Sequence, residues 1–227
     1  MEPVKQTPCP SAPPRRTPRE MFIADTHFGH KHDLSRRRPQ FASIEEMNAL
    51  LIERINRRMT GADTLYVLGD FAFRSETDPR EFLDALRPKL VLLLGNHDRD
   101  WLRHLTEEEK QHYFLRIERQ MILRKNGIEL HLNHYPLLSW DRSHYFGQTF
   151  SICGHIHANR DELVAARLFP LVTNQFNAGV DVNSFEPVTF EELVANNTAF
   201  YGRTYTEEEQ RRLDEAIRRV MAPSGAI

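Results

Sequence analysis

The chain has 227 residues, of which 40% are hydrophobic and 27% charged, and its formal net charge is −2 at pH 7. This composition is typical of a globular protein with one substantial core, and it argues against a protein dominated by nucleic-acid contacts, although a local basic patch is compatible with it. Two cysteines argue against a disulfide framework, and no stretch is long and apolar enough for a signal peptide or a membrane span. We therefore expect a cytoplasmic protein without a membrane partner, and the sequence favours no particular oligomeric state.

Residues 1–19 hold six prolines and four basic residues with almost nothing apolar to bury, which predicts a disordered basic tail. A mitochondrial presequence fits this segment less well, because the prolines would prevent its amphipathic helix. The regular pattern begins at Met21, and one domain is expected over residues 20–203. An amphipathic helix that docks on this domain is expected in residues 204–227, beginning at a capping box of Thr206 and Glu209.

In the first half of the domain, short apolar strands alternate with helices. The helices are expected to begin at a capping box of Ser43 and Glu46 and at Asp78-Pro79, and the strands are expected at residues 21–24, 64–68 and 90–94. This order is typical of layered α/β folds, in which ligands bind in the crevice beyond the carboxyl ends of the strands.

In the second half of the domain, strands predominate. A short helix is expected at a capping box of Thr106 and Glu109, and Asn126-Gly127 indicates a hairpin. The strands predicted for this half are residues 116–124, 128–133, 150–153, 168–172 and 176–180. The domain is thus expected to combine an α/β half with a β-rich half.

Polar residues of the kinds that bind metals follow strand after strand. They form five clusters: Asp25-Thr26-His27, Gly69-Asp70, Gly95-Asn96-His97-Asp98, Asn133-His134 and Gly154-His155-Ile156-His157. Carboxylates, amide oxygens and imidazoles suit Mn, Fe or Zn. In an extended segment, positions i and i+2 point to the same side, so the two ligands of Asp-x-His or His-x-His can reach one site. Each cluster taken alone is equally compatible with an ordinary turn or a core histidine, and Gly95 is expected to allow a sharp turn.

Taken in order, the five clusters match the signature D-x-H, G-D, G-N-H-D/E, H and G-H-x-H. Over about residues 21–181 the chain therefore resembles the calcineurin-like metallophosphoesterase superfamily, and in particular its small prokaryotic and phage phosphoesterases. The resemblance implies a four-layer αββα sandwich of the α+β or α/β class, with two mixed β-sheets packed face to face and flanked by helices. It also implies a dinuclear metal centre at the strand ends.

The resemblance assigns the ligands of two divalent metal ions, which could be Mn, Fe or Zn. One ion would be held by Asp25, His27, Asp70 and His157, and the other by Asp70, Asn96, His134 and His155. Asp70 would then be the bridging carboxylate. A hydroxide shared by the two ions would attack phosphorus in line with the leaving oxygen, and the two cations would offset the negative charge of the ester.

Five further residues are candidates for catalysis or substrate binding. His97 is the best candidate to protonate the leaving oxygen, and Asp98 could position the loop or the imidazole. Arg74 matches by position the phosphate-gripping arginine of phosphoprotein phosphatases, with an exposed loop arginine as the alternative. His30 and His144 could contact substrate, with solvated loop histidines as the alternative.

The chain departs from phosphoprotein phosphatases, whose second motif is G-D-x-V-D-R-G. Phe73 stands where that motif has the carboxylate that orients the leaving-group histidine, so a protein phosphatase is the least favoured enzyme. We expect a hydrolase acting on a small phosphodiester or nucleotide. One alternative is a nuclease or nucleic-acid phosphodiesterase whose basic tail touches phosphates. Another is a non-catalytic metal-binding scaffold, whose mark would be lost ligands, and no ligand of the signature is missing.

Overall fold

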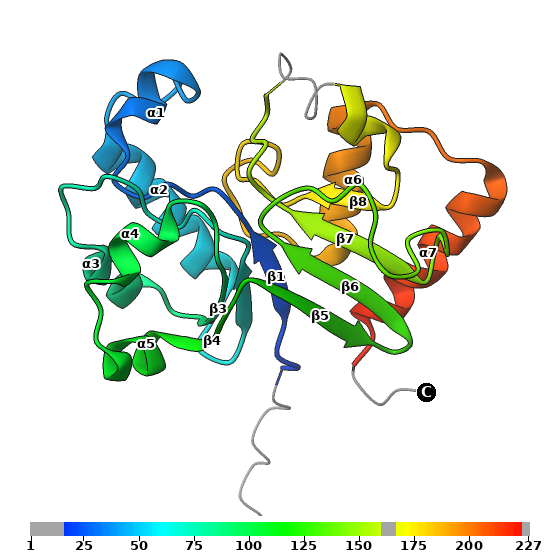
Figure 1. The fold of residues 1–227 in the computed structure, drawn as a ribbon, viewed down its shortest axis with the longest axis horizontal. Helices are drawn as coiled ribbons and strands as arrows, with labels where there is room; N and C mark the ends of the chain where they lie inside the picture. The colour runs from blue at the N-terminus through cyan, green and yellow to red at the C-terminus, as the bar shows by residue number, and fades with distance from the viewer. Residues whose placement is uncertain (1–15, 160–166, 224–227) are drawn as a thin grey trace, which may run out of the picture.

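The computed structural model describes residues 16–159 and 167–223, and it consists of two β-sheets with helices packed against them (Figure 1). The first sheet has four strands, in the order β1 (Glu20–Ile23), β2 (Thr64–Val67), β3 (Lys89–Leu93) and β4 (Phe114–Glu118). Every neighbouring pair in it is parallel. Parallel strands end at the same edge of a sheet, so the residues that follow β1, β2 and β3 are brought together.

One face of the first sheet is covered by the helices of the first half of the chain. These helices are α1 (Lys31–Arg36), α2 (Ile44–Arg58), α3 (Pro79–Ala85), α4 (Asp98–Leu102) and α5 (Glu107–Tyr113). Met47 and Leu51 of α2 belong to the same buried core as Met21, Leu65 and Leu90 of the strands. Alternate residues of these strands enter a different core, so the sheet is buried on both faces, as its continuous apolar runs predict.

The second sheet consists of β5 (Gln120–Lys125), β6 (Ile128–Asn133), β7 (Thr149–Cys153) and β8 (Gln175–Asn177). β5 and β6 form the antiparallel hairpin predicted around Asn126-Gly127, and β6, β7 and β8 are parallel. The apolar face of this sheet shares one core with the second face of the first sheet. Phe190 of α6 (Phe190–Tyr201) and Leu213 of α7 (Glu207–Met221) lie in that core too.

The two sheets meet where the chain, after β8, runs beside β1. The N–H of Ala24 donates to the carbonyl of Ala178 at 2.9 Å, and the N–H of Val180 donates to the carbonyl of Ala24 at 3.1 Å. At the far edge of the sheets, only Arg119 separates β4 from β5, so one extended segment leaves the first sheet and enters the second. The carboxyl ends of β1, β2 and β3 therefore face those of β6 and β7 across a seam.

The two sheets with flanking helices confirm the predicted fold class, although only the second sheet is mixed. The single strand predicted at 116–124 was wrong, because the chain bends there and its halves enter different sheets. The strand predicted at 168–172 was also wrong, since Phe169–Leu171 forms a 3₁₀ turn that contains a proline, which cannot donate to a sheet. The strand predicted at 176–180 is shorter, Gln175–Asn177, and the sequence interpretation missed α1, α4 and α6.

The helix starts follow their capping signals with one difference. Ser43 caps α2 by accepting from the N–H of Glu46, but the Glu46 carboxylate accepts from Ala42, so the predicted box is incomplete. Asp78, Thr106 and Thr206 cap α3, α5 and α7 as expected. In the tail predicted for residues 1–19, residues 1–15 lie outside the described residues. Within the described ranges, no helix combines the length and apolar character needed to cross a membrane.

Candidate metal centre

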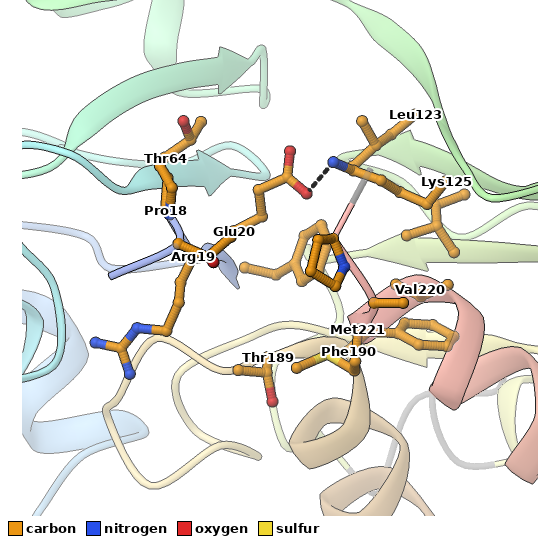
Figure 2. Close-up of a pocket in the computed structure, with 15 residues that line it drawn as sticks. Pro18, Arg19, Glu20, Thr64, Leu123, Lys125, Thr189, Phe190, Val220 and Met221 are labelled. Carbon is orange, nitrogen blue, oxygen red and sulfur yellow. Dashed lines mark ion pairs between the residues drawn. The ribbon is translucent and has the colours of Figure 1, made fainter. Parts of the chain in front are cut away.

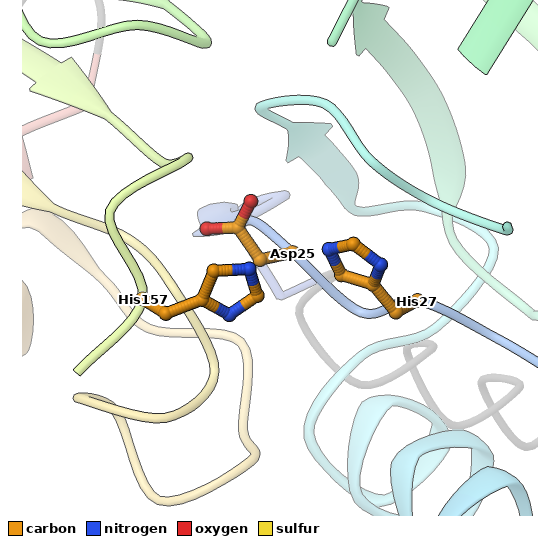
Figure 3. Close-up of side chains that lie close together, drawn as sticks. All are labelled: Asp25, His27 and His157. Carbon is orange, nitrogen blue, oxygen red and sulfur yellow. The ribbon is translucent and has the colours of Figure 1, made fainter. Parts of the chain in front are cut away.

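The candidate ligands gather at the seam between the two sheets in two groups. Asp25, His27 and His157 form the first group, and Asp70, His134 and His155 form the second. In each group, one ligand atom from every residue lies within 4.8 Å of the others. Figure 3 shows the first group, with the side chains of Asp25 and His27 from the end of β1 and that of His157 from the segment after β7 converging on one space.

The Asp70 carboxylate lies between the two groups. Its Oδ2 is 3.6 Å from Nε2 of His27 in the first group and 3.5 Å from Nε2 of His134 in the second. Its Oδ1 accepts a hydrogen bond of 3.0 Å from the backbone N–H of His97. One carboxylate is therefore within reach of both groups, which is the position that a bridging ligand needs.

Asn96 lies with the second group, since its side-chain oxygen is 3.1 Å from Nε2 of His134. Nδ1 of His134 is 2.8 Å from the carbonyl oxygen of Leu68, which fixes the ring and leaves Nε2 toward Asp70 and Asn96. All seven predicted ligands are thus at or beside the two groups. The sequence prediction of which residues come together agrees with this geometry.

The chemistry of these side chains fits divalent cations. Both groups combine a carboxylate with two imidazoles, a donor set that suits Mn, Fe or Zn. Burial lowers the pKa of His155 to about 4, aided by the neighbouring His134, so its ring is neutral at pH 7 and can act as a ligand. Burial also raises the pKa of Asp25, and a cation beside it would favour the charged carboxylate instead.

The backbone of the ligands is not extended, so the i, i+2 argument of the sequence analysis was wrong in its geometry. Asp25 and His27 have φ of 56° and 48°, and His155 and His157 have φ of 72° and 50°. Asp70, with φ of 54°, is the fifth candidate ligand with a left-handed backbone. This conformation costs a residue that has a Cβ about 1 kcal/mol or more. Tight turns held by the surrounding fold, rather than the alternation of strands, aim these side chains.

Two glycines of the motifs, Gly69 and Gly95, leave space for side chains of candidate ligands from other motifs. A Cβ on Gly95 would lie 2.3 Å from Oδ1 of Asp70, and one on Gly69 would lie 2.3 Å from Nδ1 of His134. Gly95 does not have positive φ, so the bend that follows it at Asn96 and His97 does not require the conformational freedom of a glycine. Its role is close approach, because any side chain there would displace the Asp70 carboxylate.

Asp98 is fully buried and holds the backbone of two site loops together. Its carboxylate accepts from the N–H groups of Asp70, Phe71 and Gly95 at 2.7–2.9 Å, and from the indole N–H of Trp101 at 3.0 Å. Of the two roles considered for it, positioning the loop is therefore the one that the structure supports. Burial raises the pKa of Asp98, and the N–H of Gly95 opposes that shift.

His97 lies at the edge of the centre, with Nε2 3.9 Å from Oδ2 of Asp70. The Phe73 ring packs on its imidazole at a centroid distance of 3.5 Å and also lies 4.7 Å from the His30 ring. Burial lowers the pKa of His97, while the charge of Asp70 opposes that shift. Phe73 thus packs beside His97 where phosphoprotein phosphatases have a carboxylate.

A cavity of about 430 Å³ opens beside His27 and His97. The predicted substrate residues His30 and Arg74 line it, and so do His32, Arg36, Arg37 and Phe73. His144 does not line this cavity; it is exposed, and its ring packs on Tyr145 at 4.2 Å. The structure therefore brings two of the three predicted substrate residues to the centre.

Sequence reasoning missed two residues that hold His157 in place. Oδ2 of Asp181 is 2.8 Å from Nδ1 of His157, and the fully buried guanidinium of Arg38 binds both oxygens of Asp181 at 2.8 and 3.1 Å. Burial opposes ionisation of Asp181, but Arg38 and His157 together outweigh it and lower the pKa of Asp181 to about 2. Asp181 follows the small and apolar residues after β8, and nothing in the sequence marks Arg38.

Comparison with known proteins places this geometry in context. The sequence profile of the family described as calcineurin-like phosphoesterases matches residues 19–175. Uncharacterized protein MJ1445 of Methanocaldococcus jannaschii is 28% identical over 179 residues, which are 76% of this chain and 88% of that protein. The solved structure of AQ665 from Aquifex aeolicus, a protein of unknown function, aligns with 76% of this chain and 96% of its own at 26% identity and a TM-score of 0.57.

The phosphoesterase YfcE from E. coli aligns less closely, over 70% of this chain and 77% of its own, at 16% identity and a TM-score of 0.33. A family assignment therefore rests on the family profile and not on this alignment. The profile spans the residues of both ligand groups up to His157.

Proposed function

The chain belongs to the calcineurin-like phosphoesterase family, and from this we propose that it is a metal-dependent hydrolase of a small phosphodiester or nucleotide. The observation that carries the proposal is the position of Asp70, whose Oδ2 lies within 3.6 Å of a histidine from each ligand group. A site for two neighbouring cations suits phosphate esters, which are anionic and resist attack by a nucleophile.

We assign Asp25, His27 and His157 to one ion, Asn96, His134 and His155 to the other, and Asp70 to both. Two divalent ions bound there would offset the charge of the ester and lower the pKa of a water molecule. Manganese, iron and zinc all fit the donor set. Asp181 and Leu68 keep the rings of His157 and His134 in the orientation that binding requires.

His97 is the proposed general acid. It lies beside the centre, is only partly buried and lines the cavity that opens to solvent. Its imidazole would give a proton to the leaving oxygen as the bond to phosphorus breaks. Packing against Phe73 restricts the ring, and the bond from its own N–H to Asp70 fixes its backbone. Asp98 supports the same loop without touching substrate.

His30 and Arg74 are the proposed substrate contacts, since both line the cavity with His97. A guanidinium at this place can bind two phosphate oxygens at once. The Arg74 backbone has φ of 44°, a strained conformation that keeps its side chain beside Phe73, with the guanidinium carbon 5.0 Å from the centre of the ring.

The nuclease alternative receives less support from the described residues. Arg16 pairs with Asp63, and the N–H of Arg19 donates to the same carboxylate. This part of the basic segment is therefore bound at the amino ends of β1 and β2, where Arg19 lies beside Thr64 (Figure 2). The candidate centre lies at the carboxyl ends of those strands. These arginines are therefore at the end of the first sheet that is remote from the proposed reaction.

The test is hydrolysis by protein freed of metal and reloaded with Mn²⁺, Fe²⁺ or Zn²⁺. We expect at least one ion to give turnover of bis(p-nitrophenyl) phosphate, and Asp70→Asn to remove most of it, since this variant weakens both proposed sites. A panel of mononucleotides, cyclic nucleotides and dinucleotides then defines the substrate. No turnover with any ion, or full activity in Asp70→Asn, would overturn the proposal.

A further inference from the structure

The cavity beside His97 has two walls that come from different parts of the chain. One wall includes residues of α1 and Arg37, which follows it, and the other is formed by Phe73 and Arg74. Lys31 and Glu76 join the two walls through an ion pair of 2.6 Å. Arg36 and Arg37 contribute to the first wall and Arg74 to the second, so three guanidinium groups line one cavity.

The described residues that line this cavity include three arginines. None of the described residues that line it is acidic, and His30 and His32 add imidazoles to the three arginines. An anion bound among these guanidinium groups could accept hydrogen bonds from more than one of them.

The scissile phosphate does not need these arginines for neutralisation. In the proposed function, two cations at the ligand groups already offset its charge. His97 lines the same cavity and gives its proton to the leaving oxygen, so the leaving group lies on this side of the reacting phosphorus. Arginines on the leaving-group side would then recognise a charge that the leaving group itself carries.

We propose that the leaving group carries a phosphoryl group of its own, which Arg36, Arg37 and Arg74 bind. This inference rests on the proposed function, because it uses His97 to identify the leaving-group side. In the step, a bond forms between a water oxygen and phosphorus, and the bond from phosphorus to the leaving oxygen breaks. The electron pair of the broken bond stays on the leaving oxygen, His97 supplies its proton, and the proton lost by water passes to solvent, which later reprotonates His97.

A second phosphate one linkage away occurs in two kinds of small molecule. It can belong to a phosphorylated alcohol, as in a dinucleotide with a terminal phosphate, or to a phosphoanhydride, as in a nucleoside diphosphate. An alkoxide leaves only with a proton, whereas a phosphate leaves as a stable anion without one. A general acid in the cavity therefore favours the phosphorylated alcohol.

The experiment compares substrates that differ only in the second phosphate. Dithymidine monophosphate is assayed with and without a terminal phosphate at its 5′ or its 3′ end, and ADP represents the anhydride. We expect kcat/KM to be about tenfold higher for one of the phosphorylated dinucleotides than for the plain dinucleotide. In the double variant Arg36→Ala with Arg37→Ala, the ratio of kcat/KM for the phosphorylated dinucleotide to that for the plain dinucleotide should fall by about tenfold. Arg116→Ala, which removes an arginine of β4 paired with Glu118 outside the cavity, should keep the ratio.

The outcomes separate the two proposals. Turnover of the plain and phosphorylated dinucleotides at equal kcat/KM would overturn this inference and leave the proposed function standing. A preference for ADP would overturn the phosphorylated alcohol, and much stronger inhibition by a long single-stranded oligonucleotide than by the dinucleotides would point to nucleic acid instead. If no ester is hydrolysed, the proposed function fails, and calorimetry with thymidine 3′,5′-bisphosphate decides the anion site. About tenfold weaker binding in the double variant supports it, and unchanged binding overturns it.

Discussion

The buried carboxylate of Asp98 holds the backbone N–H of Asp70 at 2.9 Å, and so it fixes the residue that lies between the two ligand groups. The same carboxylate binds the N–H of Gly95 at 2.7 Å, which joins the loop after β2 to the loop after β3. The contacts of Asp98 therefore set the position of Asp70.

Asp98→Asn should lower the free energy of unfolding by about 2–4 kcal/mol. The side-chain NH₂ of asparagine would replace one of the two carboxylate oxygens that accept from the N–H groups of Asp70, Phe71 and Gly95. Metal affinity should fall as well, since the Asp70 backbone is no longer held. Urea unfolding and titration with Mn²⁺ measure the two effects. Asp100→Asn, which changes an exposed acid of the same helix, is the control. Equal stability of the two variants would contradict the role assigned to Asp98.

Gly95→Ala should weaken metal binding by at least about tenfold, because the new methyl group would overlap the Asp70 carboxylate and displace it. Gly61→Ala is the matched control, since a Cβ there meets only the carbonyl of Arg87 at 3.6 Å. Calorimetric titration of both variants makes the comparison. An affinity of Gly95→Ala equal to wild type would show that the close approach is unimportant.

Phe73→Ala should slow the reaction most for substrates with poor leaving groups. The ring restricts His97, and a freer imidazole delivers its proton less efficiently, which matters for an alkoxide and hardly at all for nitrophenolate. We expect kcat to fall by about tenfold for an alkyl ester and by much less for a nitrophenyl ester. Phe73→Tyr, which keeps an aromatic ring, should restore most of the rate. A uniform loss for both esters would argue against this role.

Asp181→Asn should lower metal affinity by about 10- to 100-fold, because the ring of His157 loses the carboxylate that orients it. The loss should come from the ion bound by Asp25 and His27, and the second ion should be retained. Titration of the metal-free protein with the metal ion, with the number of bound ions counted, shows whether one site or both are affected. Loss of both ions together would mean that Asp181 supports the fold and not one ligand.

The stability of the protein should decrease in acid partly through Asp63. Burial opposes its charge, but the N–H groups of Arg19 and Thr60 and the guanidinium of Arg16 outweigh this and lower its pKa to about 2. A carboxylate with a lowered pKa stabilises the fold above its ordinary pKa of 3.8, and this contribution is lost as the pH falls from about 4 to about 2. The loss should be about 1–2 kcal/mol.

Denaturant unfolding of metal-free protein at several pH values below 5 measures this contribution, with Asp63→Asn as the reference. The difference in unfolding free energy between wild type and Asp63→Asn should shrink as the pH falls through that range. A constant difference would show that the charge of Asp63 does not stabilise the fold.

The residues that meet in the two groups could be predicted from the sequence because each belongs to a local signal, a polar cluster directly after an apolar strand. The hairpin at Asn126-Gly127 and three helix starts were marked in the same local way. Helix α6 also carries such a signal, a complete capping box of Thr189 and Glu192, which the sequence interpretation overlooked.

Other features depend on contacts between distant residues and had no local signal. The contact of Arg38 with Asp181 joins positions 143 residues apart, and neither residue indicates the other. The bend at Arg119 divides the single predicted strand into two, because each half pairs with strands of a different sheet. The left-handed backbone of Asp25 and His155 is likewise imposed by the packing around it, since aspartate and histidine tolerate that conformation better than most residues but do not require it.

The proposed ions would also act as cross-links between the two halves of the molecule. Asp25, His27 and Asp70 come from the ends of the first sheet, whereas His134, His155 and His157 come from the second. Each ion would therefore add a connection between the two sheets, which otherwise meet through their shared core and through backbone bonds near Ala24. Removal of the ions by a chelator should then destabilise the contact between the sheets before either sheet unfolds. Protease sensitivity at this contact would then measure the fraction of the protein that has bound metal.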